Sequence, residues 1–329
     1  MFQSALRPHI RAVVFNIKDM NKNEFNFLKW KYSRYLFFLK YATAVKFINL
    51  LQCFFSWLRN KETISTYPAF LRVEISRWCT VNCIYCNEPK EKIFYPFELF
   101  EQLVNSLKKH LLVVSLYEIG EPLENRYIIK YIKCANTNNI GTIICTNLSI
   151  EKDDSFWKEL VASGLDKIVV AIDGISDDIY NAYRTNGNLQ LVFSNLKKII
   201  HYKKLLRSTL RIEWQMIDFD WNKSEQLSAR RLSNQLGCDE FRIIPNAYRK
   251  RFWSESKYVR KKNCIHPYFT FLVNAYNKVR PCPVVYNVDV TIGDLNTESF
   301  DEIWNGAEIR KTRSKKKIQY RNGCKTCRS

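Results

Sequence analysis

Residues 77–86 read RWCTVNCIYC, so Cys79, Cys83 and Cys86 stand at a C-x3-C-x2-C spacing on one short segment. The chain holds 11 cysteines among 329 residues. Random placement of that many would give such a triplet about 0.01 times, so composition does not explain it. Three thiolates on one loop can hold three irons of a 4Fe–4S cluster and leave the fourth iron open to a small molecule. A zinc knuckle is the alternative, but it usually needs a second cysteine pair that the neighbouring residues do not supply.

The residues that flank this triplet alternate between strand and helix patterns. We expect strands at 70–76, 112–117, 141–146, 167–173, 210–217 and 240–245. We expect helices at 96–110, 126–136, 155–164, 189–206 and 223–236, the last with Asn222 as its N-cap. This alternation predicts βαβ units and a parallel sheet, either doubly wound or closed toward a barrel. In both architectures the functional residues gather at the carboxyl ends of the strands.

Several motifs follow these strands in order, and together they resemble the radical S-adenosylmethionine (SAM) superfamily over residues 69–329. The cysteine triplet matches the cluster loop of that family, including the aromatic Tyr85 before the last cysteine. Gly120-Glu121-Pro122 matches the end of the G-G-E-P motif, with Ile119 in place of a glycine. The resemblance implies that this segment holds the amino group of the cofactor's methionine.

Later motifs extend the resemblance. Thr146-Asn147-Leu148 is similar to a T-N-G turn, and Ala171-Ile172-Asp173-Gly174 is similar to an S-x-D-G pattern. Arg184 lies in a run that resembles the Y-x(n)-R-x-x-G pattern of the peptide- and sulfatase-modifying branch. The resemblance implies that Asn147, Asp173 and Arg184 bind the cofactor, with the Arg184 guanidinium on its carboxylate. A structural role is the alternative for each of these residues and for Glu121.

A second set of cysteines lies near the C-terminus. Cys264, Cys282, Cys324 and Cys327 follow the spacing C-x17-C-x41-C-x2-C. These residues and the segments between them resemble the auxiliary-cluster domain called SPASM in its shortened "twitch" form. Four thiolates can close off one further 4Fe–4S cluster, which implies a role in electron transfer or structural support. Tetrahedral zinc is the competing hypothesis for these four residues.

The charge balance is strongly basic. The formal net charge is +20, which favours an acidic partner such as a phosphorylated substrate, an acidic peptide, an anionic lipid or a nucleic acid. Residues 248–263 and 309–329 hold much of the excess. We see no nucleic-acid-binding motif. No apolar run has the length of a transmembrane helix, and no secretory signal pattern opens the chain, so we expect a cytoplasmic protein.

The N-terminal residues 1–68 show one apolar stripe at helical spacing. It comprises Phe37, Tyr41, Ala44, Ile48, Leu51, Phe55 and Leu58. The sequence leaves three roles open for it: packing on the outside of the barrel, lying on the inner face of a membrane as a peripheral contact, or binding a partner protein. Arg34, Arg59 and Lys61 would suit the membrane role.

These observations predict an α/β protein in three parts. Residues 1–68 form a helical extension, 69–246 a partial (β/α)6 TIM-like barrel, and 247–329 a small Fe–S domain. The resemblance implies an enzyme that cleaves SAM to a 5′-deoxyadenosyl radical, takes electrons from a flavodoxin or ferredoxin, and oxidises a sugar, cyclitol or other small acidic metabolite. A peptide- or protein-modifying maturase is one alternative, and a zinc-stabilised basic RNA-binding protein is another. The candidates for a catalytic acid or base are His266 and Glu118.

Overall fold

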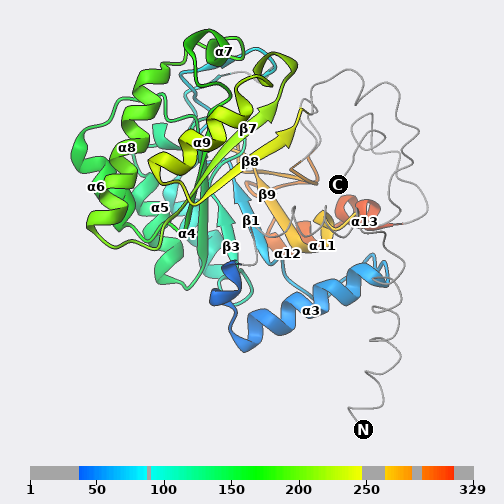
Figure 1. Cartoon of the computed structure of the whole chain (residues 1–329). Helices are drawn as coiled ribbons and strands as arrows, with labels where there is room; N and C mark the ends of the chain where they lie inside the picture. The colour runs from blue at the N-terminus through cyan, green and yellow to red at the C-terminus, as the bar shows by residue number, and fades with distance from the viewer. Residues whose placement is uncertain (1–36, 87–89, 247–263, 284–290, 315–329) are drawn as a thin grey trace, which may run out of the picture. The chain divides into compact units, whose positions relative to one another are not determined.

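The computed structural model describes residues 37–86, 90–246, 264–283 and 291–314 (Figure 1). The chain divides into two units, Met1–Ala42 and Thr43–Ser329, each described by itself. In the first unit, Phe37–Tyr41 form a short 3-10 helix, η1. All other elements of the described residues belong to the second unit.

Six parallel strands form the centre of the second unit. They are β1 (Phe70–Val73), β3 (Val113–Ser115), β4 (Gly141–Thr146), β5 (Lys167–Ala171), β7 (Arg211–Asp218) and β8 (Glu240–Pro245). They lie side by side in that order, each pair in parallel register. Each one overlaps a strand expected from the sequence. Because buried parallel strands consist of short apolar runs, periodicity and turn residues were enough to find them.

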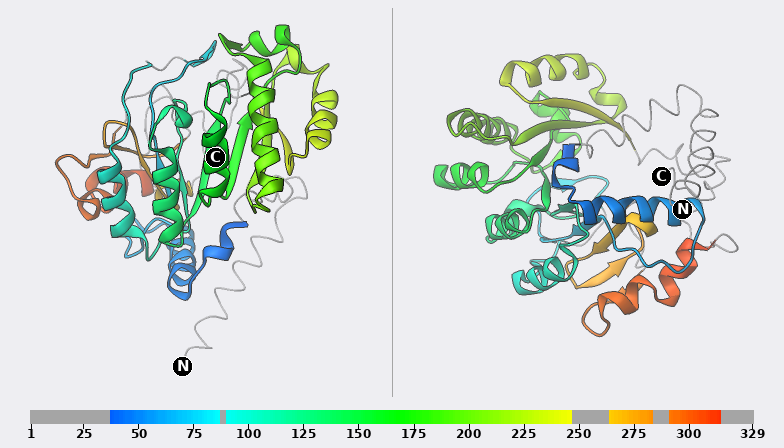
Figure 2. Two further views of the ribbon diagram at one scale, coloured as in Figure 1. Left: turned by 90° about the vertical axis from the view of Figure 1, so that its left-hand side faces the viewer. Right: turned by 90° about the horizontal axis from the view of Figure 1, so that it is seen from below.

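Five helices connect these strands, as the sequence predicts. They are α4 (Phe97–Leu107), α5 (Ile128–Thr137), α6 (Asp154–Ala162), α8 (Leu189–Leu205) and α9 (Gln226–Leu236). Figure 2 shows them along the outer side of the curved sheet. The expected fold class, a partial (β/α)6 barrel, is confirmed.

The expected start of α9 is wrong. Asn222 does not cap this helix; it ends the 3-10 turn η3 (Asp220–Asn222), and α9 begins four residues later. The Asn222 amide donates to the carbonyls of Asp173 and Ile217, each at 2.9 Å. Asn222 therefore ties the ends of β5 and β7 together, a long-range role that competes with helix capping and wins here.

The C-terminal part extends the same sheet. β9 (Thr270–Val273) pairs with β1 in parallel, and β10 (Lys278–Arg280) and β11 (Gly293–Asp294) add antiparallel strands beyond it. The helices α11 (His266–Phe269), α12 (Phe300–Trp304) and α13 (Ala307–Arg313) accompany them. The Trp304 indole N–H donates to the Thr66 carbonyl at 2.6 Å. The sheet thus runs without a break across the domain boundary predicted near residue 246, and that boundary stays a prediction.

Helix α3 (Ala44–Leu58) packs on the barrel through an unexpected face. Its buried residues are Lys46, Asn49, Cys53 and Ser56. The Asn49 amide exchanges hydrogen bonds with the backbone of Tyr67, at 2.9 and 3.0 Å. The stripe residues Ile48 and Leu51 are exposed, so the expectation that this stripe packs on the barrel is wrong for them. Within the described ranges, no helix is both long and apolar enough to cross a membrane.

Candidate active site

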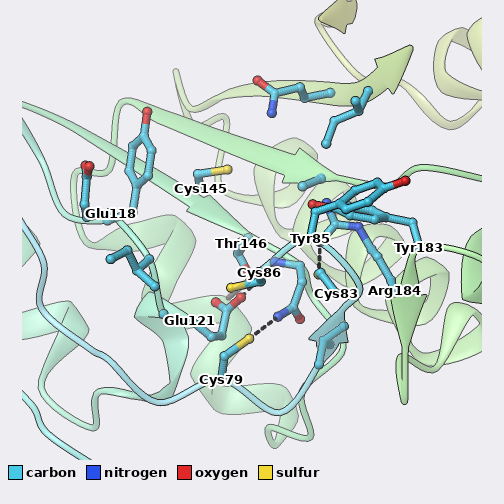
Figure 3. Close-up of a pocket in the computed structure, with 18 of the residues that line it drawn as sticks. Cys79, Cys83, Tyr85, Cys86, Glu118, Glu121, Cys145, Thr146, Tyr183 and Arg184 are labelled. Carbon is cyan, nitrogen blue, oxygen red and sulfur yellow. Dashed lines mark hydrogen bonds between the residues drawn. The ribbon is translucent and has the colours of Figure 1, made fainter. Parts of the chain in front are cut away.

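A cavity of about 360 Å³ opens at the carboxyl ends of the central strands (Figure 3). Such an edge is where loops from many strands converge. All three cysteines of the first triplet line it. The other described lining residues that matter below are Tyr85, Tyr117, Glu118, Gly120, Glu121, Cys145, Thr146, Asn147, Tyr183, Arg184 and Gln215. The strand order therefore brings together residues that are up to about half the chain apart in sequence.

A two-stranded ribbon holds the cysteine loop in place. β2 (Asn82–Cys83) pairs antiparallel with β6 (Arg184–Thr185), which sets Cys83 opposite Arg184. The Ile84 N–H donates to the Tyr183 carbonyl at 3.1 Å, and the Cys86 N–H donates to the Cys83 carbonyl at 2.9 Å. Backbone hydrogen bonds thus fix the loop independently of any bound group.

Polar groups reach two of the thiols. The Asn147 amide nitrogen lies 3.4 Å from Cys79 Sγ, and Arg184 Nη1 lies 3.9 Å from Cys83 Sγ (Figure 3). Burial raises the pKa of the Cys79 thiol to about 12 and raises the pKa of Cys83, where the Arg184 guanidinium opposes the shift. Thiols in such surroundings ionise readily only when a cation or metal compensates for burial.

Glu121 is a buried carboxylate that organises the turn after β3. It is 2% exposed, and its Oε2 accepts the Asn147 N–H at 2.8 Å while Oε1 accepts the Leu123 N–H at 3.1 Å. Burial raises the pKa of Glu121 to about 7, against the opposing effect of these hydrogen bonds. The carboxylate thus borders the cavity beside the Cys79 thiol and is available to a cationic group.

Gly120 is where two loops come closest. A Cβ at this position would lie 2.3 Å from the Ser76 carbonyl oxygen, well inside any normal contact. The Glu121 N–H donates to the Trp78 carbonyl at 2.8 Å, which holds the two loops at this separation. The glycine of the G-E-P segment is therefore required sterically. Ile119, which replaces a glycine of the family motif, lines the cavity.

The turn after β4 places a non-glycine residue, Leu148, in a left-handed backbone conformation. Leu148 has φ of +54°, the left-handed region in which the family pattern has glycine. A non-glycine residue there costs roughly 1–2 kcal/mol. The Leu148 side chain is fully buried, and its N–H donates to Thr146 Oγ1 at 3.0 Å. Core packing offsets the strain, and Asn147 stays aimed at the cavity.

The far side of the cavity is polar. Glu118 is fully buried, and its Oε2 lies 2.7 Å from Arg72 Nη2. Burial raises its pKa, with Arg72 opposing the shift. In Figure 3 Glu118 and Arg184 lie on opposite sides of the cavity. The Glu118 residue thus lines the far side of the cavity while its carboxyl group is buried against Arg72.

Some predicted site residues lie behind the cavity. Pro122 and Asp173 are not among the described residues that line it; Asp173 binds Arg184 instead, Oδ2 to Nη2 at 2.6 Å. His266 begins α11, just before the N-terminal end of β9, while the cavity lies at the carboxyl ends of the strands. Cys145 and Gln215 also line the cavity, and Gln215 was not expected there from the sequence. A polar residue inside the buried stretch around Gln215 is the pattern that could have shown it.

The second cysteine set is described in part. Cys264 precedes α11 and β9, and Cys282 follows β10, which runs antiparallel to β9. Both therefore lie at the N-terminal end of β9, the opposite end of the sheet from the first triplet. Cys324 and Cys327 lie outside the described residues.

Comparison with known proteins identifies the family. A model of the radical SAM superfamily matches residues 73–210, and a model of SPASM, an iron–sulfur cluster-binding domain, matches residues 264–328. The chain belongs to the radical SAM superfamily and carries a C-terminal SPASM domain. This finding replaces the hypothesis of a zinc-stabilised RNA-binding protein.

Curated relatives cover part of the chain. A probable GTP 3′,8-cyclase of Methanococcus aeolicus is 30% identical over 151 residues, 44% of this chain and 48% of that protein. The GTP 3′,8-cyclase of Lactiplantibacillus plantarum is 26% identical over 211 residues, 59% of each chain. The chain thus spans about half the length of the first relative and three fifths of the second.

Solved structures agree on the fold. Streptococcus suis SuiB bound to its precursor peptide SuiA is similar with a TM-score of 0.62 and 13% identity, over 81% of this chain and 71% of SuiB. The protein anSMEcpe with bound AdoMet has a TM-score of 0.56 and 15% identity, over 78% of this chain and 88% of that one. At this identity the likeness concerns the fold.

The superfamily's cofactors are a 4Fe–4S cluster and SAM, and the residues present fit both. Across the described residues, no three His, Cys, Asp or Glu side chains converge on one metal ion. A cluster makes no such demand, because each thiolate binds a different iron. Three thiols on one cavity, a neighbouring buried carboxylate and a facing guanidinium supply sulfur ligands for iron and counter-charges for the amino and carboxylate groups of SAM.

Proposed function

We propose that this protein is a radical SAM enzyme that oxidises a small acidic or phosphorylated metabolite. The main support for this proposal is that the thiols of Cys79, Cys83 and Cys86 line the same cavity as Glu121 and Arg184. When bound, the cluster and SAM supply a 5′-deoxyadenosyl radical that removes a hydrogen atom from the substrate. The protein's own part is to bind, orient and enclose the reactants.

We assign cofactor-binding roles to polar residues of the cavity. The three thiols hold the cluster, Glu121 accepts the amino group of SAM, and Arg184 binds its carboxylate. Asn147 and Tyr85 border the same volume. The remaining predicted cofactor residues act from behind: Gly120 permits the close approach of the loops, Pro122 starts the turn η2 (Pro122–Glu124), and Asp173 holds Arg184.

Two observations support a small acidic substrate. Pro245 lines the cavity, and the sequence that follows it carries seven Lys or Arg residues and one acid between 248 and 263. The curated relatives described above are named for their action on GTP, which is a phosphorylated metabolite. A peptide is the second candidate, favoured by the fold likeness to SuiB in complex with its precursor peptide.

Glu118 is our candidate for the group that orients or deprotonates the substrate. It lies across the cavity from Arg184 and carries a raised pKa because it is buried. Burial favours the neutral form of this carboxyl group, and a carboxyl group can act as a general acid or base. His266 lies at the other end of the sheet, so we assign it no role in this reaction.

The C-terminal cysteines complete the scheme. Cys264, Cys282, Cys324 and Cys327 would hold an auxiliary cluster, which would supply an electron acceptor and so allow a net oxidation of the substrate. A flavodoxin or ferredoxin supplies the first electron. The place of action we propose is the cytoplasm, with the outward side of α3 as the contact with the inner face of a membrane.

The test of the cavity assignment is cofactor cleavage. Protein purified without oxygen and rebuilt with iron and sulfide should form 5′-deoxyadenosine from SAM and dithionite, and Cys83→Ala should abolish this product. Cys134→Ala is the matched control, since this thiol lies on α5 and is not among the lining residues. Protein that carries zinc without iron, or full activity of Cys83→Ala, would overturn the proposal.

The test of the substrate class is product formation. Glu118→Gln should retain cofactor cleavage and lose oxidised product, because the residue contacts only the far side of the cavity. Phosphorylated sugars, cyclitols and nucleotides should serve as substrates in the wild-type enzyme. Turnover of a precursor peptide and of none of these would select the peptide alternative.

A further inference from the structure

We propose that the outward side of α3 binds the surface of an anionic lipid bilayer. The proposal goes beyond the enzymatic function and does not depend on it. It rests on how the helix is turned. The side chains that α3 presents to solvent are apolar except for Gln52, and the side it presents to the barrel combines Lys46, Asn49, Cys53 and Ser56 with the partly buried Leu50, Phe54 and Trp57.

The exposure of this side is large for apolar residues. Val45 is 52% exposed, Phe47 48%, Ile48 53% and Leu51 41%, and Ala44 is exposed as well. A surface helix of a globular protein ordinarily has the reverse arrangement, with its apolar stripe toward the core. Exposed contiguous apolar surface of this kind marks a site of interaction.

Specific contacts hold the helix in this inverted orientation. The Lys46 ammonium donates to the Asn139 carbonyl, the Asn49 amide pairs with the Tyr67 backbone, and the Cys53 thiol donates to the Tyr67 carbonyl at 3.2 Å. These groups are buried and satisfied. Turning the helix about its axis would leave their polar partners on the barrel without these hydrogen bonds, which is unfavourable.

The charge of the segment selects the partner. Residues 43–61 contain no Asp or Glu, and their exposed basic residues are Arg59 and Lys61, with Glu62 as the first acid after them. Arg59 and Lys61 are exposed directly after the end of α3. Anionic headgroups attract such residues while the adjacent acyl chains accept apolar side chains.

This contact is compatible with an open active site. α3 bonds to Tyr67 and Asn139, which precede β1 and β4, and it contacts α11, which precedes β9. The helix therefore covers the N-terminal ends of these strands, and the cavity opens at their carboxyl ends. A bilayer on α3 leaves the cavity facing the aqueous phase.

The experiment is vesicle co-sedimentation of the full chain. Vesicles with phosphatidylglycerol should bind the protein at low salt, and vesicles of pure phosphatidylcholine should bind it about tenfold or more weakly. The triple variant Phe47→Gln/Ile48→Gln/Leu51→Gln should lose about tenfold or more in binding. Leu205→Gln/Leu227→Gln is the matched control, because these leucines are 60% and 61% exposed on other elements and should leave binding unchanged.

Three outcomes would overturn the proposal. One is the absence of binding to anionic vesicles, the result expected if residues 1–36 or another partner covers this side. A second is equal binding by the triple variant. A third is a dimer in light scattering that the triple variant converts to a monomer, which would assign the surface to a second copy. Formation of 5′-deoxyadenosine, measured on the same preparations, tests the enzymatic proposal separately.

Discussion

Arg184 Nη2 lies 2.6 Å from Asp173 Oδ2, and both side chains are at least nine-tenths buried. Arg184 Nε binds the same carboxylate oxygen at 2.7 Å, while Asp173 Oδ1 accepts the Ile217 N–H at 2.6 Å. Because Arg184 is also paired with Cys83 through β2 and β6, this ion pair connects the cysteine loop to the ends of β5 and β7. This ion pair thus ties together the elements that form one wall of the cavity.

Asp173→Asn should therefore destabilise the protein and loosen the cavity together. Removing one charge of a buried pair leaves the other uncompensated, which typically costs about 3–5 kcal/mol. We expect the free energy of unfolding in urea to fall by roughly that amount. Asp177→Asn, an exposed change on the neighbouring helix α7 (Asp177–Asn181), should change it by less than about 0.5 kcal/mol. Equal stability of the two variants would contradict the structural role of Asp173.

Gly120→Ala should destabilise the protein and weaken SAM binding for a steric reason. The added methyl would meet the Ser76 carbonyl at 2.3 Å, and neither loop can retreat without breaking the hydrogen bond from Glu121 to Trp78. We expect a loss of about 1–3 kcal/mol and weaker SAM binding by calorimetry. Gly237→Ala is the comparison: its Cβ has space, so only its φ of +101° resists, and SAM binding should stay unchanged. Unaltered SAM binding in Gly120→Ala would contradict the close approach.

Glu74 predicts a pH dependence of stability. It is fully buried after β1, accepts the Ala275 N–H at 3.0 Å, and has its pKa raised to about 7 by burial. The folded state then binds more protons than the unfolded state between the ordinary pKa and about 7, so stability is lost as the pH rises through this window. Between pH 5 and pH 8 the wild type should therefore lose about 3 kcal/mol of its free energy of unfolding through this group. The Glu74→Gln variant should not show this loss.

The measurement is urea unfolding of the cluster-free chain at both pH values. Glu121, whose pKa is also raised to about 7, should retain its own share of the slope in this variant. Glu98→Gln, an exposed substitution on α4, should leave the slope as it is in the wild type. A slope in Glu74→Gln as steep as in the wild type would show that this carboxyl group does not titrate as expected.

Lys167→Met tests a buried network inside the barrel. Lys167 Nζ lies 2.8 Å from Glu213 Oε2 and 2.9 Å from Glu240 Oε2, and Glu213 has no exposure. The variant should lose about 3–5 kcal/mol, and Lys167→Met/Glu213→Leu should recover most of that loss, because the remaining buried cation, Arg242, keeps Glu240 as its partner at 3.8 Å. Lys223→Met, which breaks an exposed pair with Asp220, should cost less than about 1 kcal/mol. A double variant no more stable than the single one would contradict this account.

The sequence determined the features that depend on neighbours along the chain. The strands β4 and β8 have the bounds expected from their apolar runs, and the cysteine triplet lies on the loop where its spacing placed it. Periodicity and turn residues act over a few positions, so one chain without relatives was enough to find them. The order of the motifs along the chain then indicated the family.

Tertiary structure decided which surfaces these elements present. Periodicity located the apolar stripe of α3, but only the hydrogen bonds of Lys46 and Asn49 to distant carbonyls turned that stripe outward. The motif around Asp173 predicts a residue that binds the cofactor. In the structure the Asp173 carboxylate forms an ion pair with Arg184. β9 joins β1 across about 200 residues of chain, a pairing that no local pattern encodes. Each of these contacts forms between two segments that are far apart in the chain. Patterns within either segment therefore do not predict the contact.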